Sequence, residues 1–137
     1  MPRTRYCGVD RDPKALAAAR ARHPSARFVD ADALDTAERR FDILLSFNVL
    51  QHSTAEERRA LYALWRKLLN CGGSLILLEN VLPCDTTGIH AVSIEEIVLD
   101  LGGAFGGCIN VETFQTISYP VYDGISPSVL VNLIAYS

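Results

Sequence analysis

The sequence has 137 residues, of which 49% are hydrophobic and 21% charged, and its formal net charge is -3. These values are typical of one globular domain with a sizeable core, and they exclude a disordered chain. No Lys or Arg follows Lys67, which disfavours a nucleic-acid groove along the second half, so we expect no nucleic-acid partner. Arg20, Arg22 and Arg27 could form a small basic patch, but a solvated helix face explains them as well.

The cysteines and the apolar runs bear on the cell compartment. Cys7, Cys71, Cys84 and Cys108 lie far apart, without CxxC spacing or a nearby His, which predicts reduced, mostly buried thiols and no metal site. The sequence has no signal-peptide pattern, and its apolar runs are far shorter than the ~20 residues of a membrane span. We therefore expect a cytoplasmic protein that does not enter a membrane.

The first third of the chain is predicted to alternate strand, helix and strand. Residues 6–10 form a short apolar strand. Asp12 can cap a helix with Pro13 in its first position, where the missing N–H costs nothing, and this helix runs to about His23. Residues 27–29 form the next short strand.

The middle of the chain repeats this order. The continuous apolar run FDILLSF (41–47) predicts a buried strand, and residues 74–79 (SLILLE) predict another. Between them, overlapping capping boxes start a helix whose end precedes two glycines. The residues concerned are Ser53, Thr54, Glu56 and Glu57 for the capping boxes, Leu61, Leu64, Trp65, Leu68 and Leu69 for the apolar helix face, and Gly72 and Gly73.

The last third predicts a helix and a hairpin. Ser93 with Glu96 is a capping box for a helix that ends at Gly102. Residues 97–107 (IVLDLGGAFGG) also look like a glycine loop displaced by circular permutation, but the capping box favours the helix. Residues 109–121 and 126–137 have strand character and flank the turn-forming DGISP, so we expect them to pair antiparallel. The order of elements predicts an α/β sheet covered by helices on both faces.

Open parallel sheets bind ligands beyond the carboxyl ends of their strands, so the residues there are the candidates for a site. Asp10 could accept hydrogen bonds from a ribose diol, or Asp10 or Asp12 could simply cap the helix. Asp32 could accept from the exocyclic amine of adenine, or it could be a turn residue. Glu79 is expected to close its strand rather than to take part in chemistry.

Four segments together resemble the class I S-adenosylmethionine-dependent methyltransferases. GVDRDPKAL resembles the acidic second-strand motif, FVDADAL the third-strand adenine motif, and FDILLSFNVLQHS the fourth-strand motif. LLNCGGSLILLE resembles the segment before strand five, with NCGG where KPGG is common. The resemblance implies a single domain over residues 1–137 with a Rossmann-like, mostly parallel sheet and a C-terminal antiparallel hairpin.

The resemblance also implies how S-adenosylmethionine would be bound. Asp10, with Arg11 beside it, would bind the ribose, Asp32 and Ala33 the adenine, and the backbone of Phe47 and Asn48 the methionine end. The family's first strand and its GxGxG loop would lie before residue 5, where the sequence has only MPRT, so we expect an N-terminally incomplete domain. Strand edges would then be unpaired, and a second copy of the chain or a partner chain could complete the sheet.

His52 is the only histidine at a predicted functional end of a strand, and it could act as a general base or be structural. The expected activity is methyl transfer to an unidentified small-molecule acceptor. One alternative is a methyltransferase-like module that binds or assembles without catalysis. A nicotinamide-dependent oxidoreductase also uses a ribose carboxylate, but the Asp-Ala pair, FNVLQH and the closing hairpin disfavour it.

Overall fold

The structure, a computed structural model, describes residues 5–34, 41–80, 85, 88–106, 109–121 and 124–135. The chain divides into two compact units, Met1–Glu38 and Arg39–Ser137, and each is described here by itself.

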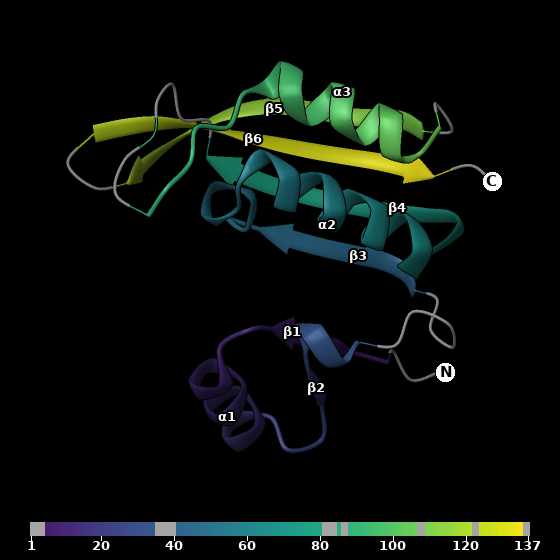
Figure 1. Cartoon of the computed structure of the whole chain (residues 1–137), viewed down its shortest axis with the longest axis vertical. Helices are drawn as coiled ribbons and strands as arrows, with labels where there is room; N and C mark the ends of the chain where they lie inside the picture. Colours follow the sequence, from purple (N-terminus) through teal and green to yellow (C-terminus); the bar gives the residue numbers. More distant parts are fainter. Residues whose placement is uncertain are drawn as a thin grey trace. The chain divides into compact units, whose positions relative to one another are not determined.

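The first unit is a β-α-β motif. Strand β1 (Cys7–Asp10) pairs in parallel with β2 (Arg27–Asp30), and helix α1 (Pro13–Arg22) connects them (Figure 1). The short 3-10 helix η1 (Ala31–Ala33) follows β2. The predicted helix start is confirmed, because the Asp12 carboxylate accepts a hydrogen bond from the Lys14 N–H at 2.8 Å.

Close contacts bind α1 and β1 to β2. A Cβ atom on Gly8 would lie 2.6 Å from Cδ1 of Phe28, so the approach of this ring requires glycine. The rings of Tyr6 and Phe28 meet edge to face, with centroids 6.0 Å apart. Arg20 donates to the Phe28 carbonyl at 3.0 Å, whereas Arg22 and Arg27 are exposed, as expected for solvated arginines.

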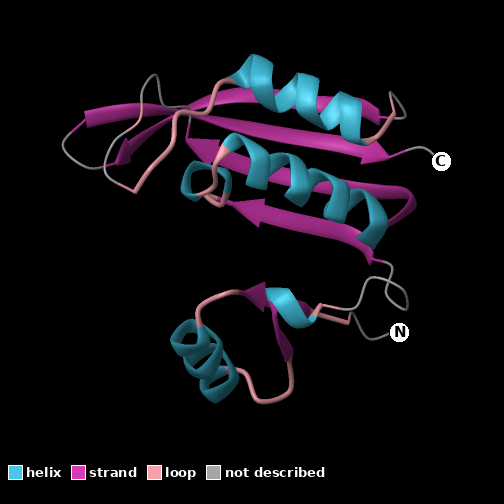
Figure 2. Cartoon of the chain, viewed as in Figure 1, coloured by secondary structure: helices cyan, strands magenta, loops and turns pink. Residues whose placement is uncertain are grey.

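The second unit is a four-stranded sheet in the order β3-β4-β6-β5 with two helices (Figure 2). Strands β3 and β4 are parallel, and β6 is antiparallel to both β4 and β5, which confirms the predicted closing hairpin. The elements are β3 (Phe41–Phe47), the 3-10 helix η2 (Leu50–His52), α2 (Ala55–Leu68), β4 (Leu69–Asn80), α3 (Ile94–Ala104), β5 (Ile109–Val121) and β6 (Gly124–Ala135).

The boundaries of β4, α3 and β6 differ from prediction, and β6 begins at Gly124, inside the predicted turn. β4 begins at Leu69, directly after α2, and its register with β3 shifts between Phe41 and Ile43, so the glycines lie within an irregular strand start. Helix α3 continues past Gly102 to Ala104, and Gly106 follows with a φ of 62°. The helical prediction for this segment is therefore confirmed, and its alternative interpretation as a displaced glycine loop is wrong.

The core of the second unit lies between the two helices and one face of the sheet (Figure 1). Tyr62 is completely buried and packs edge to face on Trp65, with ring centroids 5.5 Å apart. Leu61 and Leu64, which were predicted on the buried helix face, are only partly buried. The buried side of α2 is therefore rotated toward Arg58 and Tyr62, two residues that hydropathy alone did not select.

Within the second unit taken by itself, the described helices cover one face of the sheet, and helices on both faces stay a prediction for the chain. Leu44 packs on the core, but Ile43, Leu45 and Phe47 on the opposite face of β3 are 60%, 54% and 53% exposed. A continuous apolar run predicts burial on both sides, yet the described helices α2 and α3 both pack against one side. Among the described strands, β3 pairs only with β4 and β1 only with β2, so each has an open edge.

The cysteine and membrane expectations have separate outcomes. Cys7 is half-buried and Cys71 exposed, and both are thiols; burial of these two was predicted wrongly, and Cys84 and Cys108 lie outside the described residues. None of the helices in the described ranges combines the length and apolar character that crossing a membrane requires.

Candidate functional site

The loop after β1 is shaped by two aspartates. The Asp10 carboxylate accepts a hydrogen bond from the Asp12 N–H at 2.9 Å, and Asp12 in turn caps α1. The capping role therefore belongs to Asp12, while Asp10 holds the loop in place through one oxygen. Asp10 and Arg11 are both exposed.

The loop after β2 is built in the same way. Asp30, the last residue of β2, accepts a hydrogen bond from the Asp32 N–H at 2.8 Å and caps η1. Asp32 and Ala33 are exposed. Asp10 and Asp30 are partners in the parallel register, so the two loops lie together at the carboxyl ends of the two strands. Sequence reasoning missed Asp30, although the spacing of acids in DRD and DAD is the same.

The remaining predicted residues follow β3, in the second unit. Asn48 adopts a left-handed conformation with a φ of 55°, and its N–H donates to the Leu78 carbonyl at 2.8 Å. Phe47 and Asn48 are exposed. His52 ends η2 and is exposed. Its Nε2 atom lies 3.3 Å from the side-chain nitrogen Nε2 of Gln51.

Glu79, near the carboxyl end of β4, contacts this turn from inside the protein. It continues the buried face of Leu75 and Leu77 and is completely buried. Its carboxylate accepts a hydrogen bond from the Val49 N–H at 2.7 Å. Burial raises the pKa of Glu79 from its ordinary value of 4.5 to about 7, although backbone N–H groups of the turn and the Arg58 charge oppose the shift. The expectation that Glu79 only closes its strand missed this contact.

Further hydrogen bonds hold the turn in place. Asn80 donates a side-chain hydrogen bond to Gln51 at 3.1 Å. The Gln51 carbonyl accepts from the His90 N–H at 2.7 Å. The neighbouring strand and the segment before α3 therefore hold residues 48–52 from several sides.

Behind the turn, α2 and α3 share a partly buried ion pair. Arg58 donates to the Ser53 carbonyl at 2.8 Å and to the Glu96 carboxylate at 2.6 Å. The side chain of Arg58 is 4% exposed and that of Glu96 is 31% exposed. Burial raises the pKa of the neighbouring Tyr62 hydroxyl above its usual range.

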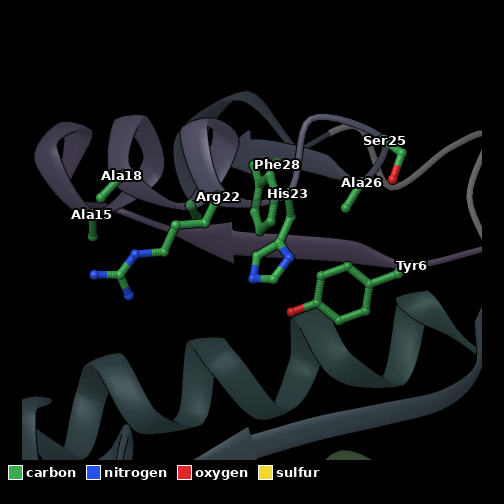
Figure 3. Close-up of a pocket in the computed structure, with 9 residues that line it drawn as sticks. Tyr6, Ala15, Ala18, Arg22, His23, Ser25, Ala26 and Phe28 are labelled. Atoms are coloured by element: carbon green, nitrogen blue, oxygen red, sulfur yellow. The ribbon is translucent and has the colours of Figure 1, made fainter.

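One hollow in the first unit lies away from the predicted residues (Figure 3). It is bordered by α1 and by residues just before β1 and β2, such as Tyr6 and Ser25. Ala15 in the first turn of α1 and Phe28 of β2 also line it, and none of its lining residues is a predicted cofactor ligand.

The fold matches solved structures of methyltransferases. A SAM-dependent methyltransferase from Methanosarcina mazei matches with a TM-score of 0.79 and 16% identity, over 95% of this chain and 81% of that one. An S-adenosylmethionine-dependent methyltransferase from Clostridium acetobutylicum matches with a TM-score of 0.76 and 12% identity, over 98% and 76%. The N-methyltransferase NodS from Bradyrhizobium japonicum, in complex with S-adenosyl-L-homocysteine, matches with a TM-score of 0.73 and 19% identity, over 97% and 67%.

A search of the curated proteins finds no match. The family described as "Methyltransferase domain" matches residues 1–75, which is more than half of the 137 residues. This sequence match agrees with the α/β fold and with the order of the four motifs. The chain therefore belongs to the class I S-adenosylmethionine-dependent methyltransferases.

Proposed function

We propose that this chain binds S-adenosylmethionine at the carboxyl ends of its strands and transfers the methyl group to a small-molecule acceptor. The main support is the pair of loops after β1 and β2, which have the same hydrogen-bond pattern and expose Asp10 and Asp32 at the carboxyl ends of the strands. The complex of NodS with S-adenosyl-L-homocysteine supports the cofactor. We further propose that residues 1–137 act as one methyltransferase domain.

The exposed side chains fit the polar groups of this cofactor. Asp10 uses one oxygen for its own loop, and the carboxylate has further lone pairs that can accept from the ribose hydroxyls, with Arg11 beside it. Asp32 would accept from the adenine amine, and the Ala33 backbone would contact the ring.

The turn after β3 would supply the remaining contacts. The backbone of Phe47 and Asn48 would contact the methionine end. When bound, the cofactor supplies a methyl group that its positively charged sulfur already activates, so positioning the acceptor is the protein's main task. His52 would take the proton that an acceptor hydroxyl or amine releases, because it is exposed and an imidazole can serve as a general base.

Asp10→Asn tests the ribose contact. Asn keeps an oxygen for the Asp12 N–H, but its amide nitrogen cannot accept from a hydroxyl. We expect calorimetric titration with S-adenosylhomocysteine to give micromolar binding for the natural chain and about hundredfold weaker binding for the variant, on the order of 2.8 kcal/mol.

Asp12→Asn is the matched control, because Asn caps helices as well as Asp does. It should bind S-adenosylhomocysteine like the natural chain. Equal affinity of Asp10→Asn and Asp12→Asn would contradict the ribose role of Asp10. A folded natural chain that binds no S-adenosylhomocysteine would contradict the proposed function.

The open edges of β1 and β3 lead to a proposal about assembly. Unpaired ladder groups and the exposed Ile43, Leu45 and Phe47 favour pairing with a second copy of the chain or with a partner chain. Sedimentation of the purified chain at high micromolar concentration should therefore show dimers or larger species. A monodisperse monomer would refute self-association. We also propose a cytoplasmic location, which the wide spacing of the four cysteines in the sequence supports.

A further inference from the structure

The buried carboxylate of Glu79 is the acid that the proposed mechanism leaves without a role. It lies among core residues, where an ionised carboxylate is costly unless hydrogen-bond donors compensate it. Its donor is the N–H of Val49, 30 residues earlier in the chain. The other carboxylate oxygen has no hydrogen-bond partner among the described residues.

The backbone of the turn is shaped to face an anion. Asn48 is left-handed, with a φ of 55°, and Val49 is right-handed helical, with φ -98° and ψ -42°. The Asn48 N–H donates to the Leu78 carbonyl, so the N–H groups that follow it, from Val49 onward, are the ones that form a concave anion-binding site. The Glu79 carboxylate lies at this site, and the N–H groups of Leu50 and Gln51 also favour its charged form.

The main opposite charge near Glu79 is that of Arg58, which favours the ionised carboxylate. From α2 come Arg58, which is bound to Ser53 and Glu96, and the buried Tyr62. From α3 come Glu96 and Asp100, whose charges help to raise the pKa of Tyr62. The turn is therefore the main hydrogen-bonding partner of Glu79.

We propose that Glu79 is a positioning residue, whose carboxylate holds the turn of Phe47, Asn48 and His52 in its binding conformation and so tightens cofactor binding when Glu79 is ionised. This inference rests on the proposed function, because it assigns that turn to the methionine end of the cofactor. A protonated Glu79 is a weaker acceptor for the Val49 N–H and carries a proton that itself needs an acceptor. The raised pKa of Glu79, about 7, places this change near neutral pH.

The test follows the Val49 amide of the natural chain by NMR between about pH 5 and pH 9, together with Glu79→Gln. We expect the Val49 amide shift to titrate with a midpoint near 7 and its hydrogen exchange to slow as pH exceeds this midpoint, after correction for intrinsic exchange. Both effects should vanish in Glu79→Gln. The Asn48 amide is an internal control, because it donates to the Leu78 carbonyl instead.

Calorimetry with S-adenosylhomocysteine over the same pH range tests the effect on binding. Affinity should rise about tenfold from about pH 6 to pH 8 in the natural chain and in the control Glu95→Gln, an exchange of an exposed acid, but stay level in Glu79→Gln. A Val49 amide that does not titrate overturns the contact with the turn. A pH dependence that persists in Glu79→Gln overturns the effect on affinity. Absence of binding at every pH overturns the proposed function instead, and the amide titration still decides whether Glu79 holds the turn.

Discussion

Glu96→Ala should lower the free energy of unfolding by about 3 kcal/mol, because it leaves the buried Arg58 guanidinium without its anion. Arg58 is 4% exposed, so its guanidinium is poorly hydrated once the carboxylate is removed. Partial exposure of Glu96 places the expected loss at the lower end for broken buried pairs. Urea unfolding followed by circular dichroism measures it.

Glu95→Ala is the matched control for this prediction. Glu95 is the neighbouring acid in the first turn of α3, but it is exposed, so its replacement should change the free energy of unfolding by no more than about 0.5 kcal/mol. The double variant Arg58→Met with Glu96→Gln should recover much of the loss, because it leaves no buried charge. Equal losses for Glu95→Ala and Glu96→Ala would refute the ion-pair argument.

The natural chain should lose about 3 kcal/mol of stability relative to Glu79→Gln as pH rises from 4.5 to about 7, at about 1.4 kcal/mol per pH unit. The sign follows from the raised pKa of Glu79. Between these pH values the folded chain holds a proton that the unfolded chain has released, so increasing pH favours unfolding. The contribution is complete below pH 4.5 and is lost as pH passes about 7.

The measurement is urea unfolding of both proteins at several pH values across this range. Other titrating groups are common to both proteins, so their effects cancel in the difference of unfolding free energies. Glu79→Gln removes the only group expected to cause the difference. If the unfolding free energies of the natural chain and of Glu79→Gln differed by the same amount at every pH, the pKa of Glu79 would not be raised in the folded protein.

Local patterns in the sequence predict much of the fold. Asp12 caps α1, Thr54 and Glu57 form the predicted capping box of α2, and Ser93 caps α3. Each involves atoms at most three residues apart, so a short window contains all the interacting groups. The strands and the antiparallel hairpin were predictable for a similar reason, because apolar runs and turn residues mark them.

The candidate site was predictable only in part. The acids after β1 and β2 stand at strand ends in the sequence, and the structure shows how Asp10 and Asp30 hold their loops. Their roles in cofactor binding stay predictions. The exposure of β3 was not predictable, because an apolar run does not say which of its faces a helix will cover.

The burial, the partners and the ionisation of Glu79 and Arg58 are decided by the tertiary structure alone. In the sequence, Glu79 ends an apolar run and Arg58 lies on a helix rich in charges, and both suggest solvated residues. Folding brings Glu79 to Val49 across 30 residues and Arg58 to Glu96 across 38 residues, and both side chains become buried. Desolvation and the distant partner set the ionisation of a buried group, and no local pattern contains either of them.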